Sequence, residues 1–334
     1  MNPLKACNMK TRLINRLITR LTTRLQTRLL VPVCVATSAL LTACGGGGGD
    51  AGSPSTNLAA VTSATVGPAK YSQTLLVTLQ GSNLDTGITV SSAGCKNMAR
   101  SSAAPNASTA TTAYYTCTVS GVGAQTVAVS RSDGLALTGA GYTVAVPQVT
   151  MTLSNTGVVQ PVLVVTLEAA KAPITTTNFL AYVNAGFYTG VVFHRYVPGF
   201  IVQGGGYTGP LTANGVLPTL KPTNAKITLE DNVGLSNTLM TVSMARSTPP
   251  SDTVDSATSQ FFVNLVNNTG LDRRGSADNQ RGYAVFGTIT SGSGLLTTLL
   301  TGPCSPWLAF FGSTDSTACL PSPNITIVSA VQTQ

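Results

Sequence analysis

The stretch that decides the fold is residues 186–206, which read GFYTGVVFHRYVPGFIVQGGG. Its apolar run contains the only histidine of the chain, His194, followed directly by Arg195. A single His without neighbouring Cys, Asp or Glu does not indicate a metal site, so we interpret His194 as structural. The run Gly204–Gly206 has neither the Gly-x-Gly-x-x-Gly spacing nor a following helix. We therefore interpret it as a turn rather than a phosphate-binding loop.

Upstream of this stretch, residues 173–186 predict a helix. Pro173 stands at its first turn and Gly186 just past its end, which are start and stop signals for a helix. Between them, Ile174, Asn178, Ala181 and Tyr182 fall at near-helical spacing. Two strand-like runs, at residues 149–153 and 162–167, precede the helix.

Two further blocks follow downstream. Residues 242–268 read VSMARSTPPSDTVDSATSQFFVNLVNN, and Leu271-Asp272 precedes GYAVFG at residues 282–287. Together with FHRYVPGFIVQGG at residues 193–205, these blocks resemble in sequence and order the signature of cyclophilin-type peptidyl-prolyl cis-trans isomerases. The resemblance runs from about residue 149 to the C-terminus and is strongest to the periplasmic cyclophilins of Gram-negative bacteria.

The resemblance implies a mainly β fold: a closed antiparallel eight-stranded barrel with two flanking helices. The second helix is short here, since residues 294–300 are barely two turns. Residues 302–321 are an insertion carrying Trp307, Phe310 and Phe311. We interpret this insertion as a disulfide-closed cover over one end of the barrel.

The resemblance also assigns the chemistry to Arg195. Rotation about an X-Pro bond crosses a barrier of about 18–20 kcal/mol because it breaks amide resonance. A fixed guanidinium that donates a hydrogen bond to the twisted prolyl nitrogen stabilises the transition state selectively. On spacing alone, Arg195 would be a solvated strand charge. Gln203 matches the side chain that orients this arginine and the substrate, and the reaction needs neither cofactor nor metal.

The positions that match the substrate-binding residues of the family are mostly apolar, as a pocket for a proline ring requires. Ile201 stands where Met is common, a swap that conserves volume. Gly270 stands where many members carry Trp or Phe, which argues against strong cyclosporin binding and for weaker peptide affinity. Phe261 and Phe286 are interpreted as barrel core. The matching positions are Phe200, Ile201, Ala245, Arg246, Gln260, Phe262, Leu271 and Tyr283.

The N-terminal segment predicts export. Seven Lys and Arg residues precede the apolar run 29–41. This run is shorter than the roughly 20 apolar residues that a membrane-spanning helix needs. The run ends in Leu-Thr-Ala-Cys44, which resembles the lipobox of bacterial lipoproteins. We therefore expect a signal peptide at residues 1–43, a lipid on Cys44 and a Gly/Ser-rich tether over residues 44–57. The alternative is ordinary cleavage nearby, which leaves a soluble protein.

The positive charge of the chain resides in this leader. The formal net charge is +8, from 19 basic and 11 acidic residues, and no acidic residue precedes Cys44. Without the leader, 12 basic residues face 11 acidic ones. This balance excludes the basic surface that nucleic-acid binding requires.

Residues 58–147 predict a small β-sandwich, because short β-type runs alternate there with turn signals. The runs lie at residues 74–79, 88–90, 114–119 and 125–129, with turns expected at Gly81–Asn83 and at Asp133-Gly134. The stretch VTLQGSNLDTGITV resembles immunoglobulin-like domains of the IPT/TIG group. A spacer and a peptide-binding module are both compatible with this domain, and we favour the spacer. The isomerase domain is then residues 148–334.

Four cysteines remain after the leader and Cys44 are set aside. Because an exported chain meets an oxidising compartment, an even number of cysteines indicates disulfides. The pairs that respect the domain limits are Cys95–Cys117 and Cys304–Cys319. None has CxxC spacing, so neither a redox site nor a zinc site is predicted.

The sequence thus predicts a prolyl isomerase for exported proteins. It would be a monomer held by its acyl anchor in the envelope of a Gram-negative bacterium, facing the periplasm and at the outer membrane, since Gly45 follows Cys44. Its partners would be proline-containing polypeptides and the lipid membrane. The alternatives are a non-catalytic module that binds proline-containing segments and a purely structural lipoprotein.

Overall fold

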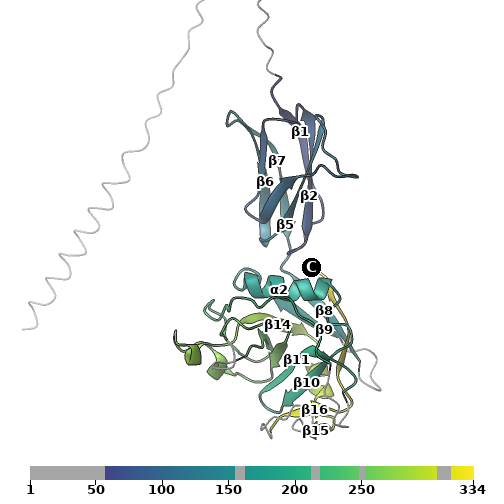
Figure 1. The fold of residues 1–334 in the computed structure, drawn as a ribbon, viewed down its shortest axis with the longest axis vertical. Coiled ribbons are helices and arrows are strands. Elements are labelled where there is room, and N and C mark those ends of the chain that lie inside the picture. The colour runs from purple at the N-terminus through teal and green to yellow at the C-terminus, as the bar shows by residue number, and fades with distance from the viewer. Residues whose placement is uncertain (1–56, 155–161, 212–218, 248–252, 307–316) are drawn as a thin grey trace, which may run out of the picture. The chain divides into compact units, whose positions relative to one another are not determined.

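The computed structural model describes residues 57–154, 162–211, 219–247, 253–306 and 317–334 (Figure 1). The expected signal peptide, the lipid site at Cys44 and nearly all of the tether lie outside these ranges, as do the three aromatic residues of the insertion. Within the described ranges, no helix is both long and apolar enough to cross a membrane.

The N-terminal part consists of two antiparallel sheets, with strand orders β1-β2-β5-β4 and β3-β6-β7. Side chains along β2 and β5 alternate between buried and more exposed, as expected when one face of a sheet packs on a core. The core includes Leu75, Val77, Leu79 and Val127. The strands are β1 (Ala60–Val66), β2 (Thr74–Ser82), β3 (Ile88–Ser91), β4 (Cys95–Arg100), β5 (Thr112–Val119), β6 (Gly123–Arg131) and β7 (Ala136–Val144).

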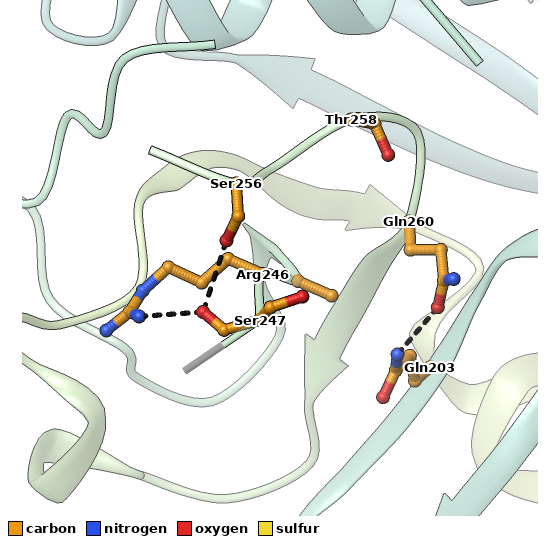
Figure 2. Close-up of a pocket in the computed structure, with 7 residues that line it drawn as sticks. Gln203, Arg246, Ser247, Ser256, Thr258 and Gln260 are labelled. Atoms are coloured by element: carbon orange, nitrogen blue, oxygen red, sulfur yellow. Dashed lines mark hydrogen bonds between the residues drawn. The ribbon is translucent and has the colours of Figure 1, made fainter. Parts of the chain in front are cut away.

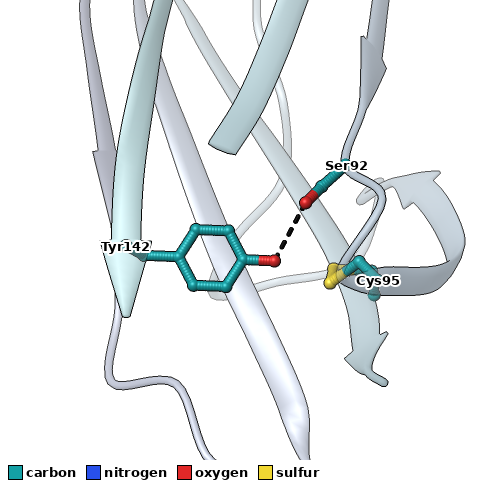
Figure 3. Close-up of a disulfide and its surroundings, with 4 residues drawn as sticks. Ser92, Cys95 and Tyr142 are labelled. Carbon is teal, nitrogen blue, oxygen red and sulfur yellow. Dashed lines mark hydrogen bonds between the residues drawn. A yellow bond between two sulfur atoms is a disulfide. The ribbon is translucent and has the colours of Figure 1, made fainter. Parts of the chain in front are cut away.

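Both expected disulfides are present. Cys95 and Cys117 join β4 to β5, with their Cα atoms 5.7 Å apart. Figure 3 shows this disulfide beside the hydrogen bond between the Ser92 and Tyr142 hydroxyls, which are 2.9 Å apart. The second disulfide joins Cys304 to Cys319, with a Cα separation of 5.5 Å.

The turn expected at Gly81–Asn83 was placed too early. Gly81 lies within β2 and pairs with Val61 of β1. A Cβ atom at this position would collide with the Ala60 carbonyl oxygen, so the glycine allows two strands to approach closely. The chain leaves the strand only at Asn83, whose φ is +54°.

Eight antiparallel strands close into the barrel that the sequence predicted. The hydrogen-bonded order is β11-β13-β12-β14-β9-β8-β17-β10, and a β10–β11 pairing closes the ring. Closure leaves none of the eight strands at an open edge. These strands are β8 (Gln148–Ser154), β9 (Val162–Leu167), β10 (Val191–Val197), β11 (Ile201–Thr208), β12 (Thr241–Met244), β13 (Phe261–Asn264), β14 (Val285–Ser291) and β17 (Thr326–Gln332).

The two ends of the insertion form a short hairpin, β15 (Cys304–Pro306) and β16 (Cys319–Pro321). This hairpin extends the sheet, because Cys319 pairs with Tyr196 of β10. The Cys304–Cys319 disulfide links its two strands. The part of the insertion that we expected to cover the barrel end falls outside the described residues.

Two helices accompany the barrel, α2 (Pro173–Asn184) and α3 (Ser293–Leu299). The first backbone N–H groups of a helix need partners from outside it. Glu230 supplies them for α2: its carboxylate accepts from the backbone N–H groups of Ile174 and Thr175 at 3.1 and 2.7 Å. Two short 3₁₀ turns, η1 (Thr269–Leu271) and η2 (Asp278–Gln280), lie in the loop that follows β13.

Aromatic side chains from the barrel wall, from α2 and from the turn after α2 pack together in the core, and we call Phe179, Tyr188, Phe193, Phe261 and Phe286 the interior cluster. Each member is at most 1% exposed. Phe261 lies 5.7 Å from Phe179 and 5.9 Å from Phe193 between ring centroids, both nearly edge to face. The sequence had assigned Phe261 and Phe286 to this core.

The expected turn at Gly204–Gly206 is wrong, because all three glycines lie within β11. A Cβ atom at Gly204 would press against Phe193, and one at Gly206 against the side chain of Gln260. Gly205 has a φ of +94° and lies against the Ser259 carbonyl oxygen. The glycines therefore serve the close packing of β11 against its neighbours.

Candidate functional site

A row of side chains crosses three neighbouring strands of the barrel wall. Arg195 of β10 pairs with Gln203 of β11, and Gln203 pairs with Phe262 of β13. Directly paired residues of antiparallel strands lie on the same face, with Cβ atoms about 4.5–5.5 Å apart. Arg195, a half-buried residue, thus belongs to the same face as the buried Phe262.

An outer apolar cluster surrounds Phe262. Its buried members are Val197, Ile201, Phe262 and Ala318, and its half-buried members are Phe200, Ala245, Leu271 and Tyr283. The rings of Phe262 and Tyr283 meet edge to face, 5.5 Å apart. The structure thus brings together six of the eight positions named as substrate-binding. Val197 and Ala318 were missed, and Ala318 could not be found from local spacing because it belongs to the end of the insertion.

A polar cavity of about 190 Å³ adjoins the cluster at Ala245. The predicted residues Gln203, Arg246 and Gln260 line it, and the Gln203 side chain donates to that of Gln260 at 2.9 Å. Figure 2 shows these side chains together with three hydroxyl residues that the sequence analysis did not single out. These are Ser247, Ser256 and Thr258.

Arg246 links the polar cavity to the outer apolar cluster. Its guanidinium donates to the carbonyl oxygens of Arg281, Gly282 and Ser247 at 2.9, 3.0 and 3.1 Å. It also lies over the Tyr283 ring, 4.9 Å from the ring centroid. These contacts hold Arg246 in one orientation and fix the Tyr283 wall by a cation–π contact.

Behind the cluster, a network of buried asparagines supports its backbone. The Asn268 side chain donates to the Phe200 carbonyl oxygen at 2.9 Å and to Asn264 at 2.8 Å. The Asn268 carbonyl oxygen accepts from the Leu271 backbone N–H at 2.8 Å. Two walls of the cluster are thus tied to one buried residue, Phe200 through the side chain of Asn268 and Leu271 through its backbone carbonyl group, and the sequence analysis did not identify this residue. Its role depends on partners distant in sequence.

His194 lies beside Arg195 but is 2% exposed and packs edge to face on Tyr207, 4.7 Å between ring centroids. Burial lowers its pKa from 6.5 to about 3, with a smaller contribution from the charge of Arg195. The imidazole is therefore neutral near pH 7 and is a poor proton donor there. Within the described residues, no group of three or more His, Cys, Asp and Glu side chains could hold a metal ion.

The chemical capacity of this site follows from its parts. It offers a fixed cation and two amide side chains beside an apolar recess, which suits a neutral, partly apolar ligand with carbonyl groups. Ser247, Ser256 and Thr258 add hydroxyl groups that can form hydrogen bonds around the polar cavity, as Figure 2 shows. The arrangement can stabilise a lone pair or a carbonyl oxygen by hydrogen bonding.

Comparison with known proteins gives the family. Residues 149–330 match the model of the cyclophilin type peptidyl-prolyl cis-trans isomerase family. Over 126 residues, 38% of this chain and 59% of the relative, the chain is 44% identical to peptidyl-prolyl cis-trans isomerase A of Dickeya dadantii. It is 43% identical to the isomerase cyp18 of Streptomyces antibioticus over 130 residues, 39% of this chain and 72% of the relative.

Among solved structures, a Cryptosporidium parvum cyclophilin type isomerase aligns with a TM-score of 0.38 and 24% identity, over 56% of this chain and 98% of that chain. The family match covers every residue of the site and the barrel except for the first residue of β8 and the last two residues of β17. The resemblance on which the sequence prediction depended is therefore confirmed. The chain belongs to the cyclophilin-type peptidyl-prolyl cis-trans isomerase family.

Proposed function

We propose that the barrel catalyses cis-trans isomerisation of X-Pro bonds in exported polypeptides. The observation that carries the proposal is the row Arg195–Gln203–Phe262, which joins a cation and an amide to an apolar recess on one face of the wall. The family match, with two relatives named as peptidyl-prolyl cis-trans isomerases, supports the same activity.

In this mechanism the proline ring occupies the outer apolar cluster. Phe200, Ile201, Phe262 and Leu271 hold the ring while the peptide bond twists. The prolyl nitrogen regains its lone pair in the twisted state, and Arg195 donates a hydrogen bond to it. Because this bond is strongest in the twisted state, it lowers the barrier rather than merely binding the substrate. No covalent intermediate and no proton transfer is required.

Gln203 orients the reacting groups in this proposal. Its amide N–H donates to the Gln260 side chain, and its amide oxygen points away from Gln260, as Figure 2 shows. The polar cavity lined by Arg246, Ser247 and Thr258 would receive a neighbouring part of the peptide. The backbone of Ala245 and Arg246 would pair with the substrate chain, as the resemblance implies.

The test is a protease-coupled isomerisation assay on short X-Pro peptides. Arg195→Ala is expected to lower kcat/KM by about 10²–10³-fold, the effect of removing one preorganised donor. Arg195→Lys should also fall well below wild type, because an ammonium lacks the planar fork. The control is Arg131→Ala, which removes an arginine that pairs with Asp133 in the N-terminal sheets and does not line the polar cavity.

Equal rates for wild type and Arg195→Ala would refute the catalytic assignment. Retained binding of proline-containing peptides with no acceleration by the wild type would instead favour the non-catalytic module. The uncatalysed step takes tens to hundreds of seconds, so acceleration is measurable directly.

We also propose that the protein acts in the cell envelope, held by a lipid on Cys44. Two disulfides and the relation to bacterial isomerases support export, and the sequence Leu-Thr-Ala-Cys44 supports the anchor. Cys44→Ala should move the protein from the membrane fraction to the soluble fraction. Unchanged fractionation would refute lipidation as the sole anchor, and separation of inner and outer membranes would test the outer-membrane assignment.

A further inference from the structure

A second cavity, of about 300 Å³, adjoins the outer apolar cluster. It shares Leu271 and Tyr283 with that cluster, and it shares Arg246 with the polar cavity of Figure 2. A ligand in the apolar recess would therefore have this second cavity within reach of its neighbouring residues. The rest of the lining is Gly270, Asp272, Arg274, Asp278, Asn279 and Arg281.

The loop that forms this cavity is fixed by Asp231, whose side chain is 1% exposed. The carboxylate accepts from Arg281 at 2.7 and 2.8 Å, from the Gly282 backbone N–H at 2.8 Å and from Arg273 at 3.4 Å. Burial raises its pKa, but the hydrogen bonds from Arg281 and Gly282 and the charges of both arginines outweigh burial and hold the pKa below its ordinary value. The carboxylate is thus ionised near neutral pH, and the cavity wall is preformed.

Some of the charged side chains that line the cavity have partners within the protein, and others form no ion pair with the described part of the chain. Arg281 is paired with Asp231, and Asp272 is engaged by the Ser236 hydroxyl and by two N–H groups of Asn237 at 2.8 Å. Among the described residues, no ion pair joins Arg246 or Arg274 to a carboxylate. Asp278, which also lines the cavity, is exposed.

Arg274 is the lining arginine most available to a ligand. Its side chain is exposed, whereas Arg246 is held by three carbonyl oxygens and Arg281 by Asp231. The Arg274 backbone is fixed, since its N–H donates to the Gln280 carbonyl oxygen at 2.8 Å. Gly270 leaves the cavity open, because a Cβ atom placed there meets nothing within 4 Å.

We propose that this cavity is a subsite for an acidic side chain of the substrate, close in sequence to the isomerising X-Pro bond. A carboxylate there would meet the fork of Arg274, with Arg246, which forms no ion pair with a described carboxylate, adding positive potential. The inference rests on the proposed isomerase function, because it takes the outer apolar cluster as the proline site. It makes the loop after η1 a determinant of substrate preference.

The experiment compares peptides that contain one X-Pro bond and carry Glu, Gln or Lys one to three residues from the proline on either side. For wild type, kcat/KM is expected to be about two- to five-fold higher with Glu than with Gln at one placement, the size of an exposed ion pair. Lys should be lower than Gln. The preference should shrink at high salt, which screens exposed charges.

Arg274→Glu should abolish or invert the ratio between the Glu and Gln peptides. The matched control is Lys171→Glu, which makes the same charge change at an exposed position lining neither cavity and should keep the ratio. Equal rates for Glu and Gln at every placement would overturn the inference, and so would a preference that survives Arg274→Glu or is lost equally in Lys171→Glu.

A failure of the isomerase function would be recognised separately. Wild type would then accelerate none of the peptides, including the Gln series. In that case, binding of the same peptides, followed by NMR shifts of the full chain, decides the subsite. Tighter binding of a Glu peptide that Arg274→Glu removes supports it, and equal binding of Glu and Gln peptides overturns it.

Discussion

The two faces of the barrel wall differ in what their aromatic residues do. The neighbours Phe261 and Phe262 of β13 are 1% and 3% exposed, yet Phe261 joins the interior cluster and Phe262 the outer apolar cluster. Side chains alternate across a strand, so adjacent residues serve opposite faces. The inner face is packed with rings, whereas the outer apolar cluster places its rings beside two cavities. The comparison teaches that burial alone does not separate core residues from site residues.

The largest expected effect comes from breaking the inner face. Phe261→Ala should lower the free energy of unfolding by about 3–5 kcal/mol, since it removes a ring from the interior cluster and leaves a cavity. Urea unfolding followed by circular dichroism measures this change. A loss below about 1 kcal/mol would contradict the assignment of Phe261 to the core.

Phe262→Ala should act mainly on activity. We expect kcat/KM for X-Pro peptides to fall about 10- to 100-fold, because full burial of a large apolar group contributes about 1.5–3 kcal/mol. Its effect on unfolding should be smaller than that of Phe261→Ala, since the outer face adjoins two cavities instead of a closed core. The pair of variants, measured in both assays, tests the comparison; equal stability losses with unchanged activity in Phe262→Ala would break it.

His194 allows a pH test on the strand that carries Arg195. Its folded pKa of about 3 lies below the unfolded value of 6.5, so only the unfolded chain binds a proton between these values. The folded state is therefore not penalised by His194 above pH 6.5, and it loses stability relative to the unfolded chain as the pH falls below this value. From pH 7 to pH 5 the free energy of unfolding should drop by about 2 kcal/mol.

Since His194 is the only histidine, His194→Gln should remove most of this dependence between pH 7 and pH 5. Unfolding by urea at several pH values measures the slope. The same slope in wild type and variant would show that another group titrates in this window.

The smallest expected effect concerns Gly270, the position where many family members carry Trp or Phe. Gly270→Trp has room, because a Cβ atom at Gly270 meets nothing within 4 Å. An added ring beside Leu271 should tighten peptide binding about two- to ten-fold, the size of one aromatic contact. KM for neutral X-Pro peptides measures it, and Gly270→Ala is the control. An increase in KM would mean that the added ring obstructs the site instead of completing it.

Local sequence was sufficient wherever chemistry and spacing act over a few residues. It determined helix α2, the strand β9, both disulfide pairs and the family, and through the family the set of residues around Phe262. It also separated Phe261 from Phe262, because alternation is a property of any strand. Helix signals and strand periodicity are local, so no knowledge of distant partners was needed.

Only the tertiary structure decided the features that depend on distant partners. The local sequence around Gly204–Gly206 predicted a turn, but the run lies within a strand. Glycines are needed there because Phe193 and Gln260 leave no room for a Cβ atom. Asp231 fixes a loop about fifty residues away, and Asn268 supports Phe200, although neither side chain stands out in the sequence. Burial of a polar side chain is favourable only when its partners are in place, and closure of the barrel brings those partners together.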